Sequence, residues 1–150
     1  MNTVLPPILH HTKYLNPNSK EWVTFIHGAG GSSSIWFKQI KAFKKHFNIL
    51  LIDLRGHGKS KKIVPENIKK YTFSSIGDDV INVLDHLKIQ KSHFIGISLG
   101  TIIIRELSDR YPDRIKTLIL GGAVMHLNLK SKILMHTGHF LRSILPYLIL

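Results

Sequence analysis

Short apolar runs recur along the first 120 residues of the chain, and polar stretches separate them. The four clearest runs lie at residues 22–26, 49–52, 93–97 and 115–120. They are rich in β-branched and aromatic residues and are mostly apolar, which predicts short strands that are buried on both faces. One or two weaker strands are expected at residues 8–15, with Asn16-Pro17-Asn18 as the following turn.

Helical periodicity appears between these runs. A third helix is expected over residues 101–111, directly after the run at 93–97. Serines at 32–34 are candidate N-caps of the first helix, and Ser74 and Ser75 precede the second, with Asp78 and Asp79 expected in its first turn. Apolar residues three or four apart mark the first two helices: Trp36, Ile40, Phe43 and Phe47, then Ile76, Val80, Val83, Leu84 and Leu87. This alternation of strands and helices predicts an α/β fold with a doubly wound, mostly parallel sheet.

Composition places the chain among ordinary globular proteins. It has 150 residues, 43% of them hydrophobic and 20% charged, which is enough for one domain with a sizeable core. Cysteine is absent, so no disulfide framework can form, and the N-terminus lacks the features of a secretory signal. We therefore expect a cytoplasmic protein.

The formal net charge of +12 raises the alternative of a nucleic-acid partner. Residues 38–70 hold ten basic side chains against two acidic ones. No aromatic side chains are interleaved with them as a stacking surface, and no nucleic-acid-binding motif accompanies them. The pattern favours a solvated basic face over a nucleic-acid site.

The pentapeptide Gly96-Ile97-Ser98-Leu99-Gly100 joins the predicted strand at 93–97 to the predicted helix at 101–111. A strand that enters a helix through so tight a turn exposes the serine hydroxyl above the sheet. The flanking glycines leave room for the turn, and the first N–H groups of the helix point toward the same place. Ser98 is therefore a candidate nucleophile, although the pattern also occurs by chance in unrelated proteins.

Two further motifs follow predicted strands, at the sheet edge where open α/β sheets bind ligands. Residues 27–31 read His-Gly-Ala-Gly-Gly and can supply a backbone N–H to a ligand, or serve only as a turn. Residues 53–60 read Asp-Leu-Arg-Gly-His-Gly-Lys-Ser. Here we favour a structured turn in which Asp53 and Arg55 hold backbone groups while Gly56 and Gly58 adopt positive φ.

Together these motifs resemble the N-terminal half of an α/β-hydrolase of the serine-nucleophile, cap-bearing kind. The resemblance covers about residues 20–123 and rests on three sets of residues in this order: His27-Gly28, Asp53-x-Arg55-Gly56-x-Gly58-x-Ser60 and Gly96-x-Ser98-x-Gly100. It implies that Ser98 is the nucleophile and that the backbone N–H groups of Ala29 and Leu99 form the oxyanion hole. His27 and His57 are then structural members of their motifs.

The activity implied by the resemblance is acyl transfer through a covalent intermediate. Ser98 Oγ would attack a carbonyl carbon of a small-molecule acyl substrate, and water would release the acyl group. An ester, a thioester or a related carbonyl compound would fit. Neither a cofactor nor a metal is expected, and the sequence does not specify an oligomeric state.

The chain departs from the family pattern after Ser98. Its remaining acidic residues are Glu106, Asp109 and Asp113, none of them in a place suited to the triad acid. Three histidines, His126, His136 and His139, lie where the family inserts its cap. One of these acting as the base is a minor alternative.

We expect residues 1–123 to form the N-terminal part of the hydrolase core, and residues 124–150 to begin a helical cap. The apolar stretch at 126–150 is too interrupted for a membrane span. The expected fold is therefore truncated before its last strands. Two hypotheses remain: the N-terminal portion of a serine hydrolase whose acid and histidine lie outside this chain, or an inactive remnant with at most a binding role.

Overall fold

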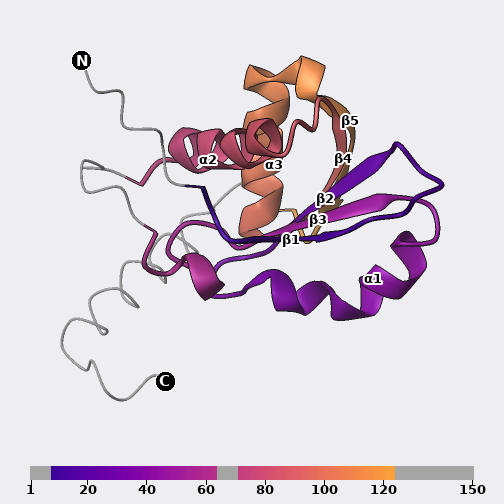
Figure 1. Cartoon of the computed structure of the whole chain (residues 1–150). Coiled ribbons are helices and arrows are strands. Elements are labelled where there is room, and N and C mark those ends of the chain that lie inside the picture. Colours follow the sequence, from indigo (N-terminus) through magenta and orange to yellow (C-terminus); the bar gives the residue numbers. More distant parts are fainter. Residues whose placement is uncertain (1–7, 64–70, 124–150) are drawn as a thin grey trace.

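The molecule is built around one five-stranded sheet, seen in a computed structural model that describes residues 8–63 and 71–123. The strand order is β1-β3-β2-β4-β5 (Figure 1). The strands are β1 (His11–Tyr14), β2 (Trp22–Ile26), β3 (Asn48–Ile52), β4 (Ser92–Ile97) and β5 (Ile115–Gly121). β1 pairs with β3 antiparallel and every other pair is parallel, so the predicted mostly parallel sheet is confirmed.

Helices cover both faces of this sheet. α2 (Phe73–His86) and α3 (Leu99–Arg110) pack on one face, and α1 (Phe37–Phe43) lies on the other (Figure 1). Short 3-10 turns, η1 (Ser33–Trp36), η2 (Gly58–Ser60) and η3 (Pro112–Arg114), connect the elements. The chain is thus doubly wound, as the alternation of patterns predicts.

The core is divided by the sheet into two apolar clusters. The larger one packs α2 and α3 against the sheet through fully buried residues such as Val80, Phe94 and Ile104. In the smaller one, the Phe25 ring lies 4.9 Å from the Trp36 ring and 5.2 Å from the Phe43 ring. Both clusters need apolar residues on the strands, which explains why the strands read as nearly continuous apolar runs.

The helix starts differ from the prediction. None of the serines at 32–34 caps α1: Ser32 precedes η1 without a capping bond, and its hydroxyl pairs with that of Ser34 at 2.7 Å. α2 begins at Phe73, where Thr72 and Ser75 form a reciprocal capping box, so Ser74 and Ser75 lie within the helix and do not precede it as expected.

Because α2 starts earlier than expected, its first turn contains no acidic residue. Asp78 and Asp79 lie in the second turn, where the helix dipole has little effect on them. Their carboxylates have side-chain partners instead, Tyr111 and Arg110 for Asp78 and Arg55 for Asp79.

β5 is an edge strand in the described part of the sheet. α3 packs beside it, and Ile115 and Leu118 contact the larger apolar cluster. On the same strand Ile119 is 53% exposed and Leu120 is 39% exposed. No helix among residues 8–63 and 71–123 has the length and apolarity that crossing a membrane requires.

Candidate active site

Ser98 occupies a sharp turn between the last residue of β4, Ile97, and the first residue of α3, Leu99. Its backbone has φ 51° and ψ −116°, a conformation that L-residues adopt only under constraint. The Ser98 N–H donates to Gly121 O at 3.0 Å, and its carbonyl accepts from Thr101 N and Oγ1 at 2.9 and 2.6 Å. These bonds are made by the Ser98 backbone. They fix the turn and leave the Ser98 side chain exposed.

The glycines that flank Ser98 are required by packing. A Cβ atom on Gly96 would lie 2.6 Å from Gly100 O, and one on Gly100 would overlap the carbonyl of Ile26. α3 therefore approaches the ends of β2 and β4 more closely than any side chain would allow. This close approach forms the turn on which Ser98 stands.

The loop after β2 lies directly beside Ser98. A Cβ atom on Gly28 would be 3.2 Å from Ser98 Cβ and 3.8 Å from Ser98 Oγ. Ala29 follows Gly28 and is exposed, while Leu99 opens α3 with its N–H at the start of the helix. The structure thus brings together the strand ends that carry Ser98, Leu99 and Ala29.

His27 is fully buried, and both of its ring nitrogens have partners. Nδ1 lies 2.7 Å from Gly28 O, and Nε2 lies 2.9 Å from Leu54 N. Because a carbonyl only accepts and an amide N–H only donates, Nδ1 carries the proton and Nε2 accepts. Burial lowers the pKa of His27, so the ring is neutral near pH 7 and not free to act as a general base.

Asp53 joins two loops at the same edge of the sheet. Its Oδ1 accepts from Ser33 N at 2.6 Å, and its Oδ2 accepts from Lys59 N at 2.8 Å. Burial acts to raise the pKa of Asp53, but these backbone bonds outweigh it and the pKa is lowered. The predicted role of Asp53 in holding backbone groups is confirmed.

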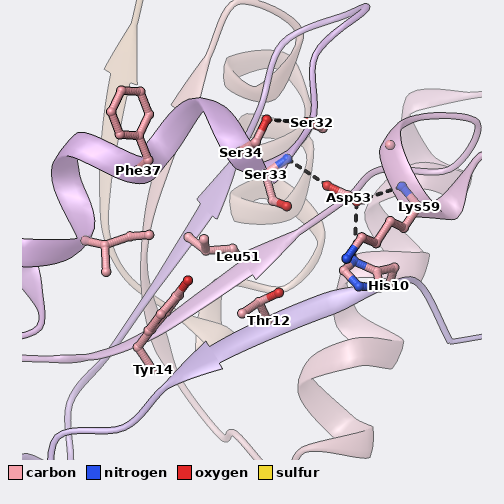
Figure 2. Close-up of a pocket in the computed structure, with 12 residues that line it drawn as sticks. His10, Thr12, Tyr14, Ser32, Ser33, Ser34, Phe37, Leu51, Asp53 and Lys59 are labelled. Carbon is pink, nitrogen blue, oxygen red and sulfur yellow. Dashed lines mark hydrogen bonds and ion pairs between the residues drawn. The ribbon is translucent and has the colours of Figure 1, made fainter.

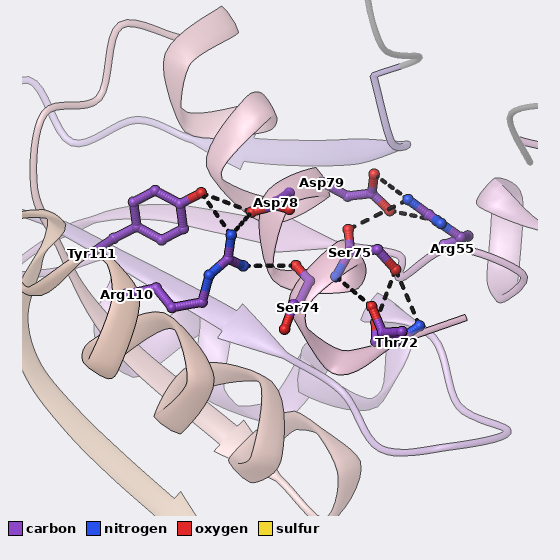
Figure 3. A network of polar contacts seen from close by, with 8 residues as sticks. All are labelled: Arg55, Thr72, Ser74, Ser75, Asp78, Asp79, Arg110 and Tyr111. Carbon is purple, nitrogen blue, oxygen red and sulfur yellow. Dashed lines mark hydrogen bonds and ion pairs between the residues drawn. The ribbon is translucent and has the colours of Figure 1, made fainter. Parts of the chain in front are cut away.

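The glycines of the same turn also behave as predicted, with φ of 75° at Gly56 and 49° at Gly58. Arg55 has a different main partner from the one expected. It is buried, and its Nε and Nη2 donate to the two carboxylate oxygens of Asp79 at 2.7 and 2.6 Å (Figure 3). Among the described residues its guanidinium donates to one backbone group, Ser75 O, at a longer 3.4 Å.

The Arg55–Asp79 pair ties the loop after β3 to α2. Burial raises the pKa of Asp79, and the Arg55 guanidinium acts in the opposite direction. A bidentate, buried pair of this kind keeps its geometry because neither charge can be left without its partner. Its signal in the sequence is weak, since the two residues are 24 positions apart.

The acidic residues after Ser98 lie away from its hydroxyl. Glu106 on α3 accepts a hydrogen bond from Ser74 Oγ, and Asp109 lies near the end of the same helix. Asp113 is in η3, which precedes β5 and therefore lies at the opposite edge of the sheet from Ser98. Within residues 8–63 and 71–123 no carboxylate or imidazole is bonded to Ser98 Oγ. His126, His136 and His139 lie outside the described residues.

A cavity of about 320 Å³ lies beside Asp53, between β1 and the segment that leads into α1. Figure 2 shows His10 and Lys59 near Asp53 at one part of this cavity and Tyr14 and Phe37 farther away. His10 Nδ1 lies 3.3 Å from Asp53 Oδ2. Ser98 does not line the cavity, and the described residues contain no cluster of side chains suited to a metal ion.

A mostly parallel sheet wound on both faces, with a serine at positive φ on the sharp turn between a central strand and its helix, defines a doubly wound α/β protein. The family model for the alpha/beta hydrolase fold matches residues 21–146. The chain belongs to this family.

Known proteins similar to this chain agree with that assignment. A putative carbamate hydrolase RutD of Agrobacterium fabrum is 38% identical over 96 residues, 64% of this chain and 36% of the relative. The 3-oxoadipate enol-lactonase 1 of Acinetobacter baylyi is 34% identical over 84 residues, 56% of this chain and 30% of the relative. The chain therefore spans about a third of the length of these curated relatives.

Solved structures of hydrolases also resemble this chain over part of their length. A hydrolase from Pseudomonas aeruginosa has a TM-score of 0.75 at 30% identity, covering 88% of this chain and 48% of the other. The enol-lactonase from Burkholderia xenovorans has a TM-score of 0.64 at 32% identity, covering 73% of this chain and 41% of the other. This chain thus matches somewhat less than half of each of these solved structures.

Proposed function

We propose that Ser98 is the nucleophile of a serine hydrolase that cleaves an ester, thioester or related carbonyl bond through an acyl-enzyme. The observation that carries this proposal is the strained backbone of Ser98, with its exposed hydroxyl beside Gly28. Strain of this kind costs about 1–3 kcal/mol and persists where the surrounding packing enforces it. In this position it presents a nucleophile.

The proposed oxyanion hole consists of the N–H groups of Leu99 and Ala29. Leu99 is the residue after the nucleophile and opens α3, so its N–H has no partner within the helix. Ala29 lies one residue past Gly28, which is beside Ser98. Donors of this kind stabilise the negative charge that develops on the carbonyl oxygen, and losing one costs roughly 3 kcal/mol.

The activating acid and histidine are proposed to lie outside the described residues, with the histidine after the acid in chain order. Residues 1–123 would then form the first part of the core, and residues 124–150 the start of a cap that shapes the acyl pocket. His27 and His57 would support the fold of their loops, and the flanking motif residues Gly28, Gly96 and Gly100 would allow the close approach.

The substrate class follows from the chemistry of the elbow and is consistent with the relatives. Their names describe a carbamate hydrolase and an enol-lactonase. Carbamates and lactones both present a carbonyl carbon attached to a heteroatom leaving group, as do esters and thioesters. A small molecule with such a carbonyl is the proposed substrate, and no cofactor is required for this reaction.

Labelling by a fluorophosphonate probe tests this function. The complete gene product should be labelled at one serine, and labelling should disappear in Ser98→Ala. Ser108→Ala is the matched control, because Ser108 lies on α3 but its hydroxyl donates to Arg105 O. Labelling that survives in Ser98→Ala would exclude Ser98 as the nucleophile.

A second candidate is an inactive remnant of such a hydrolase. It is favoured by one observation: within the described residues the hydroxyl of Ser98 is bonded to neither a base nor an acid. A folded gene product that is not labelled at Ser98, and whose coding sequence contains no later aspartate and histidine in strand-end loops, would support this candidate over the first.

A further inference from the structure

The loop that carries Ala29 is fastened to the loop after β3 on both sides of Ala29. Before it, Nε2 of His27 accepts from Leu54 N at 2.9 Å. After it, the N–H of Ser33 donates to Asp53 Oδ1 at 2.6 Å (Figure 2). Both bonds reach neighbouring residues at the end of β3. The oxyanion loop, defined here as residues 28–32, is the segment between these two attachments.

This loop has little stiffness of its own. Three of its five residues are glycines, and Gly30 adopts φ 71°. One backbone bond, from Gly31 N to Gly28 O at 3.2 Å, closes a turn within it. Because glycine leaves the backbone free to sample many conformations, the place of Ala29 depends on the attachments at either end.

Asp53, by contrast, is held from several directions. Its own N–H donates to His10 O at 3.0 Å, which continues the pairing of β1 with β3. Its carboxylate accepts from Lys59 N as well as from Ser33 N, and its side chain is 3% exposed. A carboxylate fixed in this way is a rigid reference point to which the Ser33 end of the loop is attached.

We infer that Asp53 is a positioning residue that places the N–H of Ala29 opposite that of Leu99. This inference rests on the proposed function, since it assigns the two N–H groups to an oxyanion hole. Leu99 is positioned by β4 and α3, whereas Ala29 comes from the loop after β2. Two donors on separate elements can serve one oxygen only if their loops are locked together.

Gly58 gives a way to test this role without changing Asp53. A Cβ atom on Gly58 would overlap the Asp53 carboxylate, so we expect Gly58→Ala to displace it from Ser33. Gly56→Ala is the matched control. Gly56 also has positive φ, 75°, but its Cβ would meet only the Tyr71 ring and hydroxyl, at 3.8 Å or more. Both variants carry backbone strain, and only the first is expected to move Asp53.

Amide hydrogen exchange of the whole chain is the first measurement. We expect the Ser33 amide and the amides of residues 28–32 to exchange at least about tenfold faster in Gly58→Ala than in Gly56→Ala, because a bond to a charged acceptor is lost. Amides of β2 and β4 should not differ between the variants. Equal exchange of the loop in both variants, or a faster exchange spread over the sheet, would overturn the inference.

Asp53→Asn provides a second variant should Gly58→Ala fail to fold. The amide has one acceptor oxygen, so it cannot accept from both Ser33 N and Lys59 N with separate oxygens. Faster exchange of the loop with unchanged exchange of β2 is again expected. Loop exchange equal to that of the wild type would contradict a positioning role.

The rate of fluorophosphonate labelling is the second measurement. Where Ser98 is labelled in the wild type, we expect the rate constant to fall at least about tenfold in Gly58→Ala relative to Gly56→Ala. Equal rates would refute the link to the oxyanion hole. A wild-type protein without labelling would instead contradict the proposed function, while hydrogen exchange would still decide whether Asp53 holds the loop.

Discussion

Ser98 is the residue at which backbone strain and the proposed chemistry coincide. Its φ of 51° would suit glycine, and the bonds from Thr101 and to Gly121 keep it there. The packing of α3 on the sheet offsets the free-energy cost of that strain. A serine in such a conformation, where glycine would be unstrained, supports the proposed role for its side chain.

Replacing Ser98 by glycine should therefore stabilise the fold. We expect Ser98→Gly to raise the free energy of unfolding by about 1 kcal/mol, because glycine adopts positive φ without strain. The same change at Ser108, within α3, should lower it by about 0.5 kcal/mol. Urea denaturation measures both, and a loss of stability at both positions would contradict the strain argument.

His27 makes the stability of the fold dependent on pH. Burial lowers its pKa in the folded protein below the ordinary value of 6.5. Above pH 6.5 His27 is neutral in both states, and its contribution to stability is fully present. Below pH 6.5 the unfolded chain takes up a proton first, so this contribution is lost as the pH falls through the folded pKa.

The expected result is a free energy of unfolding that declines as the pH falls from about 7 to about 5, with a shallower decline in His27→Gln. Urea denaturation at a series of pH values measures it. Glutamine can still accept from Leu54 N but does not titrate. An equal decline in the two proteins would show that another group is responsible.

Between elements, the buried Arg55–Asp79 pair connects the loop after β3 to α2 (Figure 3). The neighbouring residue Asp78 has a more exposed arrangement, with Tyr111 Oη donating to it at 2.7 Å and Arg110 2.8 Å away. Two adjacent carboxylates of α2 thus have different partners: Asp79 forms a buried pair, and Asp78 forms a pair near the surface.

Breaking the buried pair should cost far more than breaking the surface one. We expect Asp79→Leu to destabilise the protein by about 3–5 kcal/mol, because it leaves the Arg55 charge buried without a partner. Adding Arg55→Met should restore most of this loss. Asp78→Ala, the control, should cost about 1 kcal/mol or less. Thermal or urea unfolding of the four proteins distinguishes these results, and a double variant no more stable than Asp79→Leu would be inconsistent with a coupled pair.

The sequence predicts elements better than it predicts partners. Strand positions follow from apolar runs, which are local, and four strands were placed to within one residue at each end. The prediction starts α2 after Ser75, whereas the structure starts it at Phe73, because Thr72 and Ser75 form the capping box. Asp79 is predicted in the first turn of the helix, but the structure pairs it with Arg55. This pairing depends on how α2 packs on the loop after β3, which no local pattern predicts.

At the candidate site, too, local features are predicted from the sequence and contacts between loops are not. Ser98 and its flanking glycines are legible in five consecutive residues, and the turn geometry at Gly56 and Gly58 was predicted. The attachment of Ser33 to Asp53 was not, because it depends on two loops meeting at one edge of the sheet. Residues outside 8–63 and 71–123, including the predicted cap, leave that part of the prediction untested.

The sheet ends in the described residues on β5, whose Ile119 is 53% exposed. An edge strand with exposed apolar side chains is a template for pairing with other chains. We expect the 150-residue protein to aggregate, and Ile119→Lys to slow this, because a charge on the edge opposes such pairing. Ile35→Lys, at an exposed position away from the sheet edge, is the control.

Light scattering during incubation at constant temperature and protein concentration measures the effect. A clear delay in Ile119→Lys alone would identify β5 as the site of association. Equal delays in both variants would point to net charge as the cause, and a monomeric wild type with cooperative melting would contradict the expectation itself.

The close packing at Gly96 and Gly100 has a consequence for how such chains change over generations. Both glycines are demanded by the fit of α3 against β2 and β4, whatever the protein does. A lineage that abandons catalysis would thus have to keep them or lose the fold, while nothing in the packing would prevent its strained serine from drifting to glycine. The presence of the two glycines therefore indicates the fold and not the activity. Selection for catalysis would instead be seen as a serine kept at position 98.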